Sequence, residues 1–129
     1  MQAVHSSGFQ ASENGPILFA GPAIGFVVQI KGGPTLYHTG DTAWFGEMKQ
    51  IGARFHPDVL LTCIGGHFTM DPVDAALAAR DTGAKNVVPM HYGTFPVLTG
   101  TPEEFAKALK KSAPRGTMVQ LRIGEPRTF

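Results

Sequence analysis

Four of the five histidines and one aspartate stand beside short apolar stretches of the kind that form strands. The histidines are His5, His38, His67 and His91, and Asp41 follows the stretch that holds His38. In open α/β sheets, ligands gather beyond the carboxyl ends of strands, where side chains distant in sequence converge. Imidazoles with a carboxylate and no thiolate cluster are the donor set of a catalytic Zn, Fe or Mn site. The pattern favours a metal-dependent catalytic centre, although a single histidine near a strand end more often only makes a hydrogen bond.

Other reactive groups carry little functional signal. His56 precedes Pro57 in what reads as a surface loop. Cys63 lies in an apolar run without a basic neighbour, which predicts an inert buried thiol. The pair Gly65-Gly66 lacks the lysine and hydroxyl of a phosphate-binding loop, so a tight turn is the better interpretation.

Composition limits the class of protein. The 129 residues are enough for one domain, and we take residues 1–129 as a single domain. A net charge of +1 provides no electrostatic footprint for nucleic acid or an anionic membrane, so neither is an expected partner. One cysteine suits a reducing cytosol, and no segment resembles a signal peptide or a membrane span. We therefore expect a soluble, cytoplasmic protein.

Local patterns predict a β-rich first third followed by alternating strands and helices. Asp71 and Thr101 are predicted helix N-caps, each followed by proline, and Gly83 is a predicted C-cap. The predicted strands are 25–30, 35–38, 58–64, 86–90 and 118–123, and the predicted helices are 47–55, 72–82 and 102–113. This order is that of an α/β or α+β fold with at least one βαβ unit.

Four segments, in order along the whole chain, resemble motifs of the metallo-β-lactamase superfamily, and in particular its small metal-dependent hydrolases. They are Val-His-Ser-Ser at 4–7, Tyr-His-Thr-Gly-Asp-Thr at 37–42, Ile-Gly-Gly-His-Phe-Thr-Met at 64–70 and Val-Pro-Met-His-Tyr at 88–92. The resemblance implies an αββα sandwich with a metal pair at the edge between two mixed sheets. This chain resembles the C-terminal half of that fold, namely one mixed sheet with helices on one face.

The resemblance also implies roles for individual residues. His5 resembles the third histidine of the first metal site, and His91 resembles the last histidine of the second. Asp41 resembles the catalytic carboxylate that bridges the two ions. The ions are divalent, with Zn as the first expectation and Mn or Fe as alternatives. Two such ions lower the pKa of a bound water and polarise the bond to be cleaved.

Three further residues are expected around these ligands. His38 is a candidate partner that orients Asp41 from three residues away. His67 stands in a loop that borders the active site in this family, but the resemblance does not imply that it is a metal ligand. Two interpretations of Tyr92 stay open: it donates a hydrogen bond to substrate beside the metals, or it is a packed core tyrosine.

The family's His-x-His-x-Asp-His motif is absent from this sequence. Without it, each metal keeps about two protein ligands, fewer than such sites normally have. The resemblance implies a hydrolase that uses a metal-activated water on an ester, amide or phosphodiester bond of a small-molecule substrate. We expect this truncated form to be weak or inactive alone. The alternative is a non-catalytic α/β association module derived from that fold.

The predicted strands are also too apolar to face water without cover. In a complete sandwich, two sheets pack face to face and hide each other's apolar side. The chain is therefore expected to meet a partner, either a second copy in a homo-oligomer or a separate N-terminal half.

Overall fold

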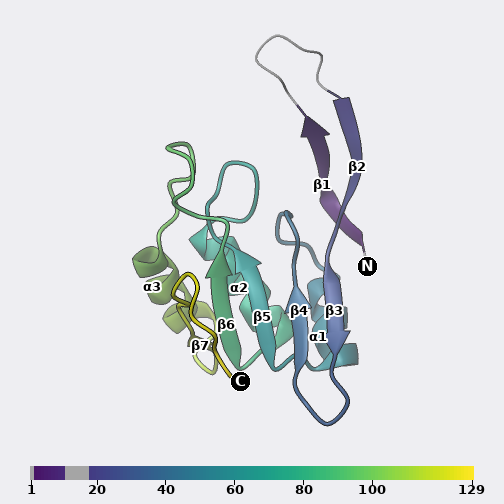
Figure 1. Cartoon of the computed structure of the whole chain (residues 1–129), viewed down its shortest axis with the longest axis vertical. Coiled ribbons are helices and arrows are strands. Elements are labelled where there is room, and N and C mark those ends of the chain that lie inside the picture. Colours follow the sequence, from purple (N-terminus) through teal and green to yellow (C-terminus); the bar gives the residue numbers. More distant parts are fainter. Residues whose placement is uncertain (1, 11–17) are drawn as a thin grey trace.

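The computed structural model describes residues 2–10 and 18–129, with side chains described from residue 23 onward. Strands β1 (Gln2–Gln10) and β2 (Leu18–Ile24) form an antiparallel pair. A five-stranded sheet has the order β3-β4-β5-β6-β7, in which only β3 runs antiparallel to its neighbour. Its strands are β3 (Phe26–Gln29), β4 (Thr35–His38), β5 (Val59–Cys63), β6 (Asn86–Met90) and β7 (Thr117–Met118). Helices α1 (Met48–Phe55), α2 (Pro72–Thr82) and α3 (Pro102–Ser112) connect the parallel strands (Figure 1).

Local capping fixes where two of the helices begin and end. Asp71 accepts hydrogen bonds from the backbone N–H groups of the first turn of α2, and Gly83 ends that helix at φ 68°. Thr101 and Glu104 form a capping box at the start of α3. These caps act over a few residues, which explains why the sequence predicts both helices correctly.

One row of apolar side chains crosses all five strands and builds the core. In the register of the sheet, Val27, Tyr37, Leu60, Val87 and Met118 are successive neighbours. All five belong to the hydrophobic core or pack against it, together with residues from all three helices. The helices lie side by side on this face (Figure 1). The predicted fold class, a mixed sheet with helices on one face, is confirmed.

The opposite face of the sheet is uncovered at its β3 and β4 side. Phe26 and Val28 alternate with Val27, and their side chains are 55% and 52% exposed. Leu36 on β4 and Leu61 on β5 lie on the same face and are only partly buried. We call Phe26, Val28, Leu36 and Leu61 the open face.

Two expectations about strands are wrong. The first is that His5 follows the end of a strand. Strands β1 and β2 were not predicted, because Gly21 and Pro22 interrupt the pattern of β2 and the register between the two strands is irregular. His5 accordingly lies within β1 and not after a strand end.

The second concerns the strand expected over 118–123, which ends at Met118. The carbonyl groups of Lys85 and Val87 accept hydrogen bonds from the β7 side. Pro89, two residues further, faces the same neighbour but has no N–H group to donate. The ladder therefore stops, and the alternating residues that follow lie on the surface, with Ile123 fully exposed.

Among the described residues, no helix combines the length and the apolar character needed to cross a membrane.

Candidate active site

Three parallel strands bring Asp41, His67 and His91 to one edge of the sheet. Because β4, β5 and β6 run in the same direction, the loops that follow them leave from the same edge (Figure 1). Asp41 lies three residues after β4, His67 lies in the loop after β5, and His91 directly follows β6. The connections through α1 and α2 thus assemble one site from distant segments.

Asp41 and His91 come together at this edge. Nε2 of His91 lies 3.5 Å from Oδ2 of Asp41. The Asp41 side chain is mostly exposed, whereas His91 is largely buried. Nδ1 of His91 is buried and has no hydrogen-bond partner. His91 also adopts φ 56°, a left-handed conformation that costs energy in residues other than glycine and that often occurs at functional sites.

Gly40, the residue before Asp41, has both its backbone N–H and its carbonyl group in hydrogen bonds. Nδ1 of His38 accepts a hydrogen bond of 3.0 Å from the N–H of Gly40. The carbonyl of Gly40 accepts from the thiol of Cys63 at 3.1 Å and from the hydroxyl of Thr39 at 2.9 Å. His38 therefore helps to hold the turn before Asp41, and its role as a partner of the Asp41 side chain stays a prediction.

The loop of His91 is packed tightly against the loop after β5. A Cβ atom on Gly65 would lie 2.2 Å from the carbonyl oxygen of His91, so only glycine fits there. The N–H of Gly100 donates to the carbonyl of Gly65 at 3.2 Å. The position of His91 therefore depends on glycine at position 65.

The geometry of Asp41 and His91 fits two ligands of one divalent ion. Two ligands held at roughly 2.1 Å from a tetrahedral ion are about 3.4 Å apart. The observed separation of 3.5 Å between imidazole nitrogen and carboxylate oxygen is close to that value and long for a hydrogen bond. The donor types are those of a catalytic metal site. A third donor is not found: the part of the chain described contains no group of three His, Cys, Asp or Glu residues suited to a metal.

The remaining predicted residues are placed as follows. The side chain of His5 lies outside the described part of the structure, although its backbone belongs to β1. His67 is exposed at φ 57°, and its ring packs edge-on against Phe68 with centroids 4.3 Å apart. Tyr92 is half-buried and packs against the hydrophobic core, which favours the packing interpretation over a direct role with substrate.

Cys63 lies just below this site as a buried thiol. Burial raises its pKa from 9.0 to about 11. At pH 8 the native thiolate is then about a hundredfold scarcer than in an unfolded chain, so a thiol reagent such as DTNB should react far more slowly with native protein than in denaturant. Since the unfolded thiol ionises first, the free energy of unfolding should fall as pH rises from about 9 to 11. Labelling that proceeds equally fast in buffer and in denaturant would contradict this.

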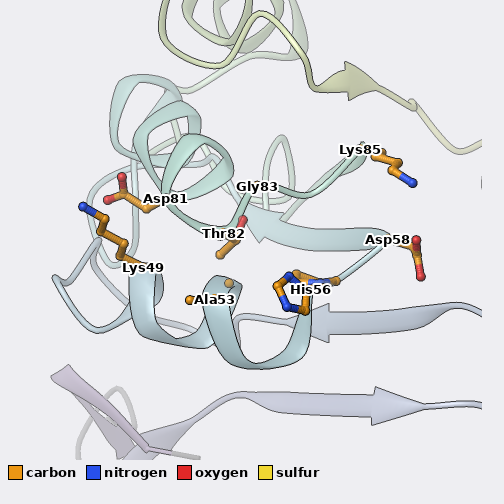
Figure 2. A pocket seen from close by; sticks show the side chains of 10 residues that line it. Lys49, Ala53, His56, Asp58, Asp81, Thr82, Gly83 and Lys85 are labelled. Atoms are coloured by element: carbon orange, nitrogen blue, oxygen red, sulfur yellow. The ribbon is translucent and has the colours of Figure 1, made fainter.

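A pocket of about 480 Å³ lies at the opposite edge of the sheet, beside the C-terminal ends of α1 and α2. Asp58 accepts a hydrogen bond from the N–H of Thr35, and Asp81 accepts from Trp44. Figure 2 shows Lys49 on the same side as Asp81, and Lys85 on the same side as Asp58. The charges of this pocket are balanced, and it contains none of the predicted site residues.

The fold and the site edge together define a class of protein. The family model described as "Beta-lactamase superfamily domain" matches residues 1–92, and the chain belongs to this family. It is 55% identical over 125 residues to a protein of Anaeromyxobacter sp. (strain K) named "UPF0173 metal-dependent hydrolase". A relative of the same designation from Thermodesulfovibrio yellowstonii is 44% identical over 124 residues.

Solved structures agree with this assignment. Igni18, described as a novel metallo hydrolase from the archaeon Ignicoccus hospitalis, is 37% identical with a TM-score of 0.76, over 98% of this chain and 50% of that one. The metallo-beta-lactamase fold protein YhfI from Bacillus subtilis is 16% identical with a TM-score of 0.64, over 97% of this chain and 45% of that one, and shows the shared fold.

The chain spans less than half the length of the curated relatives described above. The alignment with the Anaeromyxobacter protein covers 96% of this chain and 43% of that protein. The alignment with the Thermodesulfovibrio protein covers 95% of this chain and 46% of that protein.

Proposed function

We propose that this chain carries part of the active site of a metal-dependent hydrolase that acts on an ester, amide or phosphodiester bond. The observation that carries the proposal is the 3.5 Å approach of His91 Nε2 and Asp41 Oδ2 at the carboxyl edge of the sheet. Membership of the β-lactamase superfamily and relatives named metal-dependent hydrolases support it.

Each residue at the edge has a distinct task in this proposal. Asp41 and His91 would hold the metal, with His5 as a further ligand from β1. His38 keeps the turn before Asp41 in place through the N–H of Gly40. A divalent ion, with Zn proposed first, supplies Lewis acidity and makes a water more acidic. The exposed carboxylate of Asp41 would accept a proton from an attacking water.

We further propose that the chain works with a partner. The ligands assigned here are fewer than two metal ions require. The open face exposes Phe26 and Val28 on the side of the sheet turned away from the hydrophobic core. Either a second copy or a separate N-terminal half would bury these side chains and could add ligands at the same edge.

The proposal is tested by metal binding to the wild-type chain and to Asp41→Asn, which keeps the shape of the side chain and removes its charge. With Zn²⁺ and Mn²⁺ in calorimetric titrations, we expect Asp41→Asn to bind about 10- to 100-fold more weakly, because a charged ligand is lost. Asp74→Asn removes the same charge from α2 and should bind like wild type. Equal affinity for wild type and Asp41→Asn would reject the assignment.

A non-catalytic association module is the second candidate. The lack of a three-donor group among the described residues is the observation that favours it. Metal content should be measured together with hydrolysis of p-nitrophenyl acetate and bis(p-nitrophenyl) phosphate, with and without a co-expressed partner. A chain that binds no metal and shows no turnover in either setting would establish the association module instead.

A further inference from the structure

Three large apolar side chains project into solvent from the loops beside Asp41 and His91. Phe68 lies in the loop over residues 64–71 after β5, and Phe95 and Val97 lie in the loop over residues 91–101 after β6. Their side chains are 50%, 62% and 40% exposed. We call Phe68, Phe95 and Val97 the apolar rim. Figure 1 shows both loops extending beyond the carboxyl ends of their strands.

The two loops are held against each other by their backbones. The N–H of Gly100 donates to the carbonyl of Gly65, and Gly65 lies directly against His91. The N–H of Leu98 also donates to the carbonyl of Phe95, which closes a turn within the second loop. The apolar rim therefore belongs to the same packed structure that positions His91.

The loops at this edge of the sheet differ from the rest of the chain in their charged side chains. The three loops that leave it, over residues 39–47, 64–71 and 91–101, contain none of the chain's eleven lysines and arginines. Their charged side chains are the carboxylates of Asp41, Glu47 and Asp71. Phosphate esters are normally held by arginine and lysine as well as by metal ions. These loops offer a phosphodiester no cationic side chain, whereas they offer an uncharged substrate an apolar surface.

We infer that the substrate of the proposed hydrolase is an uncharged ester or amide whose apolar group rests on the apolar rim, and not a phosphodiester. The inference rests on the proposed function and narrows its substrate class. Exposed apolar side chains next to a reacting group add binding energy in proportion to the apolar area they cover. The carbonyl compound would thus be anchored by its hydrocarbon part while its polar group faces Asp41 and His91.

The test uses neutral and anionic probes with the whole chain and requires neither metal nor turnover. ¹H–¹⁵N NMR titrations would compare N-butylacetamide, N-hexylacetamide and dibutyl phosphate. The amide signals of Phe68, Phe95 and Val97 should shift, and affinity should rise about twofold for each methylene added, as for half-buried CH₂ groups. N-hexylacetamide should therefore bind about fourfold more tightly than N-butylacetamide, and dibutyl phosphate should bind more weakly than both.

Variants then locate the binding surface. In Phe68→Ser with Phe95→Ser, the fourfold preference for the longer chain should fall toward onefold. Phe129→Ser removes an exposed phenylalanine far along the chain and should keep the preference. Well-dispersed spectra of each variant serve to check folding. Tighter binding of dibutyl phosphate, shifts confined to other regions, or an unchanged preference in the double variant would overturn the inference. Those results would leave the metal-binding test of Asp41 untouched, so the two proposals fail separately.

Discussion

Replacement of Gly65 by alanine is expected to lower the free energy of unfolding by about 3 kcal/mol, the upper end of typical overpacking costs. The new Cβ would lie 2.2 Å from the carbonyl oxygen of His91, and backbone atoms cannot move aside as a flexible side chain can. Since small domains are stable by only about 5 to 15 kcal/mol, this is a large share of the total. Urea unfolding followed by circular dichroism measures it, and the displaced His91 should also weaken metal binding.

A matched glycine provides the control. A Cβ on Gly46 would have no atom within 4 Å, and its backbone does not need a positive φ. Gly46→Ala should therefore leave stability unchanged or raise it by about 0.4 to 1 kcal/mol, because alanine restricts the unfolded chain. If Gly65→Ala unfolds at the same urea concentration as Gly46→Ala, the close approach of Gly65 to His91 does not hold in solution.

Sedimentation of the isolated chain at micromolar concentration is expected to show a dimer or larger assembly. Burial of about 600 Å² of apolar surface in an interface contributes a favourable free energy of roughly 15 kcal/mol, from which the costs of association are subtracted. The double variant Phe26→Ser, Val28→Ser should shift the assembly toward monomer and weaken association at least about a hundredfold. In a two-fold symmetric dimer each substitution removes two side chains from the interface, which makes the effect large.

Exposed apolar residues outside the open face provide a control for nonspecific hydrophobic association. Ile123 and Phe129 are also exposed, in the C-terminal segment. Ile123→Ser with Phe129→Ser should leave the sedimentation profile unchanged. A well-folded wild-type monomer at micromolar concentration would contradict self-association. Binding of that monomer to a co-expressed N-terminal half, lost in Phe26→Ser, Val28→Ser, would then identify the separate half as the partner.

Local signals predicted most of the five-stranded sheet and its helices. The strand at 86–90 and the helix bounded by Asp71 and Gly83 were correct because caps and apolar runs act within a few residues. The strand expected over 118–123 was too long, since its end is decided by Pro89 on a neighbouring strand. This effect depends on which residues of the two strands lie opposite each other, and the sequence of one segment alone does not reveal that.

Of the candidate site, too, one part could be predicted from the sequence and another part could not. The approach of Asp41 to His91 could be expected because both follow parallel strands. The role of Gly65 could not, since its requirement for glycine comes from a tertiary contact with His91. The apolar rim was not predicted either, although Phe95 and Val97 stand in a loop without charged residues, which was a signal in the sequence. Whether Asp41, His91 and His5 bind metal stays a prediction.

Pro89 has one further consequence, for how copies of this chain can meet. Long edge strands with free backbone groups invite other chains to add to the sheet, and proteins commonly shorten such edges to prevent aggregation. By ending the ladder after Met118, Pro89 leaves β7 as an edge of only two residues. The β7 edge therefore offers few backbone groups to which a strand of another chain could pair. For the self-association proposed above, we therefore expect contacts between copies on the β3 side, in an assembly that closes on itself instead of extending into fibres.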